Sequence, residues 1–177
     1  MNLVGRLAVG ALVTIAAGFF LFNMTKGSAD AASQAEPAAG IQIAELTPAE
    51  SIVKRQELMK QLGGHMKAVK AFLESNEGNS ADVATHAQAI QTASGQIVEL
   101  FPVGTSLDDN VAKTAAKPAI WEKSDDFKAS ADTLGVEAGK LVEVAATGDA
   151  IAIGDQFGSL GKNGCGGCHS EFRQKTE

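Results

Sequence analysis

Residues 48–74, PAESIVKRQELMKQLGGHMKAVKAFLE, decide the fold class, because their apolar side chains recur with the spacing of one helix face. The positions that repeat every seven residues are Ile52, Met59, Met66 and Leu73, with Leu62 and Val69 between them. Thr47-Pro48-Ala49-Glu50 is typical of a helix start, with Thr as the N-cap and Pro in the first turn. We therefore expect an amphipathic helix from Pro48 to about Glu74.

Three further segments carry the same periodicity. We expect helices over residues 81–100, from Pro118 onward, and over residues 150–172. Ser80 is the expected cap of the second helix, and Thr147-Gly148-Asp149 is the expected turn and cap before the fourth. The inward rows are Val83, Ile90 and Ile97; Ile120, Phe127, Leu134 and Leu141; and Ile153, Phe157 and Leu160. The pattern predicts an all-α fold, an antiparallel four-helix bundle.

The sequence leaves two features of this bundle undecided. Residues 102–117 form a longer connection with weak periodicity, which a bundle tolerates as a crossover. Ala131, Ala138 and Ala145 form a row of small residues on the third helix. Such a row either allows close helix packing or leaves room for a bulky group.

The N-terminal part has the composition of a targeting segment. An uncharged run from Leu7 to Met24 follows Arg6, so residues 1–24 are a signal or a signal-anchor segment. Ala29-Asp30-Ala31 offers a small-x-small cleavage site, and the alternative is that the run stays as a membrane anchor. Residues 25–46 read as a flexible linker and residues 47–177 as the bundle domain. We expect a periplasmic domain, either soluble after cleavage or tethered to the inner membrane.

The chain is acidic, with a formal net charge of -6 over 177 residues and no basic patch. This charge distribution argues against nucleic acid as a partner. The chemistry lies instead at Cys165, Cys168 and His169, which on a helix would share one face. Two thiols can add to the vinyl groups of a haem while the imidazole binds its iron. A thioredoxin-like dithiol would need the pair near a helix start in a βαβ unit.

The motif therefore predicts one covalent haem c per chain, with His169 as the axial ligand of the iron. Only eight residues follow His169, and none is Met or His, so a second ligand would come from another helix. The candidates are Met59, His65, Met66 and His86. Both methionines fit the apolar row and equally suit the core. We expect His65 at the surface, and His86 partly buried and hydrogen-bonded.

Two arginines suggest contacts to the haem. Arg55 falls on the inward row, where an unpaired charge is costly to bury, so a haem propionate is an attractive partner. The alternative is a side chain that extends to the solvent at the bundle end. Arg173 lies one turn past His169, either near the haem or offsetting the helix dipole.

Several segments together resemble the cytochrome c prime family. They are Arg55-Gln56-Glu57-Leu58-Met59, Leu100-Phe101-Pro102-Val103-Gly104-Thr105, Lys117-Pro118-Ala119-Ile120-Trp121 with Phe127, and Cys165-Gly166-Gly167-Cys168-His169 with Arg173. The resemblance implies a left-handed bundle, often a homodimer through its first two helices. It also implies a five-coordinate, high-spin iron.

The resemblance assigns roles to individual residues. It implies that Met59 packs over the open iron face without ligating it, and that Arg55 and Gln56 lie near the propionates. It places Thr105 at the haem edge and Arg173 close to the axial histidine. Ser106 departs from the family, which often has an acidic residue there.

We therefore expect a periplasmic haem protein that binds small diatomic gases, NO and CO, or transfers electrons to a redox partner protein, or does both. The alternative is a six-coordinate, low-spin electron carrier with Met59 as the second axial ligand. An enzyme would need polar acid and base groups on the distal side, and the expected wall is apolar.

Overall fold

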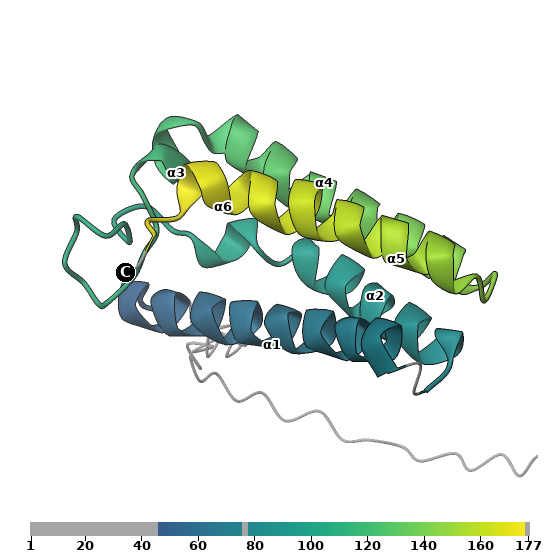
Figure 1. Cartoon of the computed structure of the whole chain (residues 1–177). Helices are drawn as coiled ribbons and strands as arrows, with labels where there is room; N and C mark the ends of the chain where they lie inside the picture. Colours follow the sequence, from purple (N-terminus) through teal and green to yellow (C-terminus); the bar gives the residue numbers. More distant parts are fainter. Residues whose placement is uncertain (1–45, 76–77, 176–177) are drawn as a thin grey trace, which may run out of the picture. The chain divides into compact units, whose positions relative to one another are not determined.

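The computed structural model describes residues 46–75 and 78–175, and these form an antiparallel four-helix bundle (Figure 1). Its helical runs are α1 (Pro48–Ser75), α2 (Ser80–Ser94), α4 (Ser124–Ala145), and α5 (Ala150–Ser159) with η2 (Leu160–Gly166) and α6 (Gly167–Phe172). The predicted fold class is confirmed. The predicted leader and nearly all of the predicted linker lie outside the described residues, so the domain boundaries stay a prediction.

No helix within the described ranges combines the length and the apolar character that a membrane crossing requires.

Helix α1 begins as the sequence predicts. The Thr47 N–H donates to the Glu50 carboxylate at 2.8 Å, and the Glu50 N–H donates to the Thr47 hydroxyl at 3.3 Å, which is a capping box. Its buried apolar residues are Ile52, Leu58, Leu62 and Val69, whereas Met59, Met66 and Leu73 are half-buried. The helix therefore buries Leu58 more deeply than Met59, and the inward face is rotated slightly from the predicted row.

Helix α2 is shorter than predicted. It ends at Ser94, and a separate 3-10 turn, η1 (Val98–Leu100), follows it. Gly95 stands at the end of the helix, where its low helix propensity favours a stop. The N-cap is also one residue earlier than predicted: Asn79, not Ser80, exchanges hydrogen bonds with Asp82.

The predicted third helix is broken near its start. Its first turn is α3 (Ala119–Glu122), and Lys123, with φ -125° and ψ 52°, separates it from α4. The indole N–H of Trp121 on α3 donates to the Phe101 carbonyl at 3.0 Å. This first turn is thereby tied to the end of the α2–η1 segment.

Helices α2 and α4 pack closely. A Cβ atom at Gly135 would lie 2.6 Å from the Ser94 hydroxyl, and one at Gly139 would lie 2.7 Å from the Gln91 amide nitrogen. The alanines of the α4 row, Ala131, Ala138 and Ala145, are buried. The two glycines therefore let α4 approach α2 closely, and the alanine row is buried in the core.

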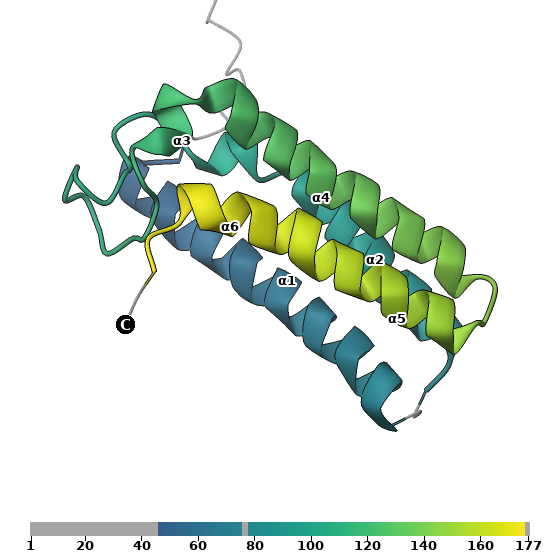
Figure 2. The same cartoon turned by 45° about the horizontal axis from the view of Figure 1, so that its top comes forward.

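The fourth helical run follows the predicted path but changes its geometry. Figure 2 shows α5 and α6 as one continuous helical run beside α4. The segment between them, η2, is a π-helix, because the Gly167 N–H bonds to the Lys162 carbonyl five residues earlier. Gly164 within it is buried, and a Cβ there would lie 3.1 Å from Leu134 Cδ1 and 3.3 Å from Leu134 Cα. The wider helix alters the angle between Cys165 and the residues after it, and π-helical turns often occur at functional sites.

The contact between Gly164 and α4 can be tested by substitution. Gly164→Ala forces a methyl group against the Leu134 backbone, and overpacking of this kind costs about 1–3 kcal/mol. Urea unfolding of the purified protein measures the change. Gly63→Ala on α1 is the control, because nothing lies within 4 Å of its added Cβ. It should stabilise the protein by up to about 1 kcal/mol. Equal effects of the two variants would contradict the crowding at Gly164.

Candidate functional site

The two cysteines of the motif are free thiols that face the bundle core. Cys165 lies in η2 and Cys168 in α6, and both are half-buried against the apolar core. Burial raises the pKa of both thiols, and the pKa of Cys168 rises to about 11. Both sulfur atoms are therefore protonated thiols at neutral pH, held close together in apolar surroundings.

His169 lies beside them at the edge of the bundle. It lines an open hollow of about 370 Å³ together with Gly166, Ser170 and Arg173. Although part of the ring is exposed, desolvation and then the charge of Arg173 lower the pKa of His169 below its ordinary value. The imidazole is therefore held in its neutral form, which is the form that binds metals.

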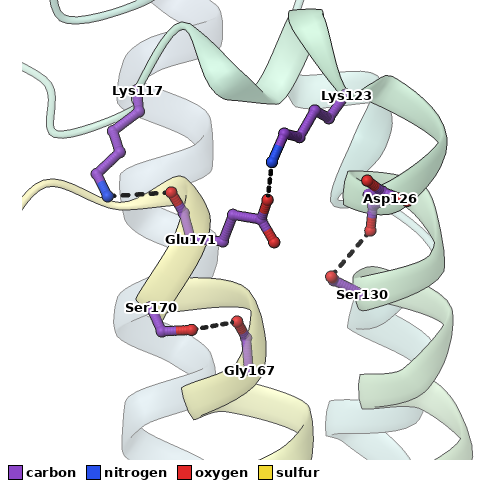
Figure 3. A network of polar contacts seen from close by, with 7 residues as sticks. All are labelled: Lys117, Lys123, Asp126, Ser130, Gly167, Ser170 and Glu171. Atoms are coloured by element: carbon purple, nitrogen blue, oxygen red, sulfur yellow. Dashed lines mark hydrogen bonds and ion pairs between the residues drawn. The ribbon is translucent and has the colours of Figure 1, made fainter.

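Polar contacts attach α6 to the α3–α4 region (Figure 3). The Glu171 carboxylate accepts from Lys123 Nζ at 2.6 Å, and the Glu171 carbonyl accepts from Lys117 Nζ at 3.0 Å. The Ser170 hydroxyl donates to the Gly167 carbonyl at 2.8 Å. Exposed ion pairs contribute little to stability, so these contacts orient α6 more than they hold the fold.

The backbone after the motif is held more firmly. Ala116 and Arg173 form an isolated antiparallel bridge, with the Lys117 N–H bonding to the Phe172 carbonyl at 3.0 Å. The Gln174 N–H bonds to the Ala115 carbonyl at 2.8 Å. The connection between α2 and α3 therefore fixes where the motif helix ends.

The same connection surrounds Arg55. Arg55 as a whole residue is 3 % exposed. Its guanidinium donates to the Thr105 hydroxyl at 2.8 Å, to the Thr105 carbonyl, and to the Thr114 hydroxyl at 2.7 Å. It also lies 4.5 Å from the centroid of the Phe101 ring. Burial lowers the pKa of Arg55 to about 10.

Arg55 has no acidic partner in the described parts of the chain, where no carboxylate lies within ion-pair distance of it. The alternative prediction, in which the Arg55 side chain extends to the solvent, is wrong because the residue is buried. A buried cation without a counter-ion is unusual, because a charge removed from water needs a compensating one. This environment suits an anionic group of a bound ligand.

Gln56 and Thr105 also join α1 to the connection. The Gln56 amide donates to the Lys113 carbonyl at 2.8 Å, and the fully buried Thr105 hydroxyl donates to the Pro102 carbonyl at 2.8 Å. Ser106 stands where the resemblance implies an acidic residue, and its N–H donates to the Asp109 carboxylate at 2.7 Å. The acidic group thus stands three residues further along the chain.

Aromatic side chains connect the Arg55 environment to the motif helix. Phe101 packs edge-on against Phe127 with ring centroids 4.9 Å apart, and Phe127 packs against Phe172 with centroids 5.3 Å apart. Phe172 is the last residue of α6. The structure therefore brings Arg55 and the Cys-x-x-Cys-His motif to the same end of the bundle.

The four candidates for a second iron ligand divide into two groups. Met59 and Met66 on α1 are half-buried against the core, and the Met66 methyl lies 3.9 Å from the Cβ position of Gly161 in η2. His65 and His86 instead face each other, with their Nδ1 atoms 3.0 Å apart. The partly buried, hydrogen-bonded His86 is confirmed. The prediction of a surface His65 is wrong, because the ring is half-buried against α2.

Three features of this site lay beyond the sequence analysis. Thr114 gave no signal, because a single threonine in a loop has no distinguishing pattern. Ser106-x-x-Asp109 could have been found as a side-chain turn, since Ser and Asp at this spacing commonly bond to local backbone. The facing of His65 and His86 depends on how two helices pack, which periodicity within each helix does not specify.

Comparison with known proteins identifies the family. The family model described as Cytochrome C′ matches residues 50–173. The chain belongs to the cytochrome c′ family. It is 35 % identical to cytochrome c′ of Pararhodospirillum photometricum over 72 % of this chain and 99 % of the relative. It is 36 % identical to cytochrome c-556 of Agrobacterium tumefaciens (strain B2A), with the same coverage of both chains. Members with these two names are thus about equally similar.

Solved structures agree. Cytochrome c′ from Thermochromatium tepidum superposes with a TM-score of 0.67 at 32 % identity, over 75 % of this chain and all of that one. A cytochrome c′ described as having an unusual ligand-controlled dimer dissociation gives the same TM-score at 34 % identity, again over 75 % of this chain and all of that one.

The family implies a c-type haem, and the residues present fit one. The two neighbouring thiols and the neutral imidazole supply the donors that this group requires. The buried Arg55, at the same end of the bundle, is a cation that could balance the carboxylates of such a group. The donor set and the electrostatics therefore point to the same group.

The structural role of Arg55 can be tested against a surface arginine. Arg55→Leu removes the donor to the buried Thr105 carbonyl and hydroxyl, whereas the Thr114 hydroxyl keeps its bond from the Ala116 N–H. We expect a loss of about 2–3 kcal/mol, because unsatisfied buried groups cost about 1–3 kcal/mol each. Urea unfolding measures the loss. Arg173→Leu, at an exposed position, should change stability by less than about 0.5 kcal/mol. A loss at Arg55 no larger than at Arg173 would show that the buried network is unimportant.

Proposed function

We propose that this cytochrome c′ family member carries one haem c per chain, attached through thioethers to Cys165 and Cys168, with His169 as the axial ligand. The observation that supports this proposal is the donor set itself: two half-buried thiols facing the core beside a neutral imidazole. When bound, the group supplies an iron that changes oxidation state and accepts a further small ligand.

The residues around the motif then have distinct tasks. Arg55 balances the charge of a propionate, and Gln56 lies near the same groups. Thr105, held by its hydrogen bonds with Arg55 and Pro102, lies near the haem edge. Desolvation, and after it the charge of Arg173 on the proximal side, lowers the pKa of His169 and favours a neutral axial imidazole. The π-helical turn η2 sets the angle between the two thiols.

On the distal side we propose a five-coordinate, high-spin iron that binds NO or CO. The supporting observation is that His65 and His86 are paired with each other, which leaves methionine side chains as the distal candidates. Met59, half-buried against an apolar core, excludes water and bulky ligands. A small neutral diatomic needs no hydrogen-bond partner and can enter by displacing this side chain.

Two structural neighbours, forms of cytochrome c prime from Alcaligenes xylosoxidans, are described as a nitric oxide complex and a carbon monoxide-bound variant. Each superposes with a TM-score of 0.63 at 22 % identity, over 73 % of this chain and 98 % of that one. This likeness supports the fold alone, and the gas-binding proposal rests on the distal residues of this chain.

The remaining parts of the proposal concern the setting of the protein. We place it in the periplasm, either released or anchored by residues 1–24, where it exchanges electrons with a redox partner protein. We also propose that two copies pair through α1 and α2. The protein has no catalytic role in this proposal. The second candidate is a six-coordinate electron carrier, which the thioether of Met59 on α1 favours.

Covalent attachment can be tested by intact mass. The protein matured in a host with a c-type haem attachment system should carry the added mass of one haem after denaturation. Cys165→Ala with Cys168→Ala should lose it, whereas Gly63→Ala on α1, where nothing lies within 4 Å of the added Cβ, should retain it. A denatured parent chain at the mass of the bare polypeptide would refute the proposal.

The distal proposal is tested by two substitutions at Met59 and a matched one at Met66. Met59→Leu keeps the bulk of the side chain and removes the thioether, so a five-coordinate protein should keep its high-spin ferrous spectrum. Met59→Ala should speed carbon monoxide binding by opening the distal face, and Met66→Ala should change this rate less. Optical spectra and stopped-flow mixing measure both effects.

Sharp low-spin bands in the parent that disappear in Met59→Leu would instead establish the six-coordinate alternative. An unchanged carbon monoxide rate in Met59→Ala would show that this side chain does not control entry.

A further inference from the structure

The two histidines outside the motif form a pair between neighbouring helices. His65 on α1 and His86 on α2 approach with their Nδ1 atoms 3.0 Å apart, and their rings are tilted by 48°. Both side chains are half-buried. The proposed function uses neither of them. Two imidazoles that converge from separate helices are a common donor arrangement for transition-metal ions.

The spacing of the two nitrogens is close to what an ion requires. Zinc binds imidazole nitrogen at about 2.0–2.1 Å, so two nitrogens on a tetrahedral zinc lie about 3.3 Å apart. The observed 3.0 Å is within a few tenths of an ångström of this value, which a small ring rotation provides. When these rings hydrogen-bond as neutral imidazoles, one Nδ1 carries the proton. Moving that proton to Nε2 frees both lone pairs without creating a charge.

The surroundings leave room for further ligands. His65 lines an open groove of about 450 Å³ between α1 and α2, which Gln61, Thr85 and Gln88 also line. Within residues 46–75 and 78–175, no group of three or more His, Cys, Asp or Glu residues could hold a metal ion. His65 borders the groove and His86 does not, so an ion held by both imidazoles would take its remaining ligands as water molecules on the His65 side.

We propose that His65 and His86 bind one divalent transition-metal ion per chain through their Nδ1 atoms and so link α1 to α2. The affinity should follow the usual order for nitrogen ligands, with Cu²⁺ bound more tightly than Zn²⁺. This site is separate from the Cys-x-x-Cys-His motif and does not depend on the state of the iron.

Calorimetric titration of the holoprotein with Zn²⁺ tests the site, and zinc is chosen because it has no redox chemistry. We expect one zinc per chain. His65→Ala and His86→Ala should each weaken binding by at least about tenfold, since each removes one of two protein ligands. Gln88→Ala is the matched control, because it lines the same groove without supplying an imidazole. It should bind zinc as the parent does.

Thermal unfolding gives a second measurement. Zinc should raise the Tm of the parent and of Gln88→Ala, and leave that of His65→Ala unchanged. His86→Gln, which keeps a polar side chain of similar size, replaces any alanine variant that fails to fold. A variant that carries both His65→Ala and His86→Ala completes the set. Three results would overturn the proposal: no zinc bound by the parent, zinc binding by this double variant equal to that of the parent, or half a zinc per chain with formation of a dimer.

Discussion

The end of the bundle that carries the Cys-x-x-Cys-His motif depends on one constraint, the burial of the Arg55 guanidinium. A charge removed from water is tolerated only where its donors are satisfied, and Thr105 and Thr114 of the connection accept three of its hydrogen bonds. The connection is thereby fixed against α1. Because the same connection pairs with the backbone around Arg173, fixing it also fixes the end of α6. One buried cation therefore links the first and last helices, which are distant in sequence.

The position of the motif within the last helix depends on a second constraint, the close approach of Gly164 to Leu134. Glycine has a poor helix propensity, so a run containing Gly161, Gly164 and Gly166 gains little from ideal α geometry. The π-helical turn lets this run follow α4 closely while the chain continues as a helix into α6. The thiols then face the core, and His169 stays at the edge of the bundle. Tertiary contact, rather than local preference, decides the geometry at the cysteines.

Local sequence rules were sufficient to predict the four helices. The Cys-x-x-Cys-His motif was found from its residue types and their spacing alone. The capping boxes and apolar rows are local patterns, and Thr47 and Asp149 cap their helices as expected. The break at Lys123 and the π-helical turn were missed because they depend on contacts between segments distant in sequence. The end of α2 at Ser94 was also missed, although Gly95 is a local signal for it. Arg55 was rightly placed inside by its row, yet its partner Thr114 could not be found, since the path of the connection is not periodic.

The pairing of His65 with His86 bears on the distal face as much as on metal binding. Imidazole is a strong ligand for haem iron, so a free histidine on α1 near the methionines would compete for the distal position. In this structure both imidazoles are directed to each other at the α1–α2 contact, and the thioethers of Met59 and Met66 remain on the side of the core. The same interhelical contact that we propose as a metal site thus keeps both imidazoles away from the core side of α1, where thioether side chains pack instead.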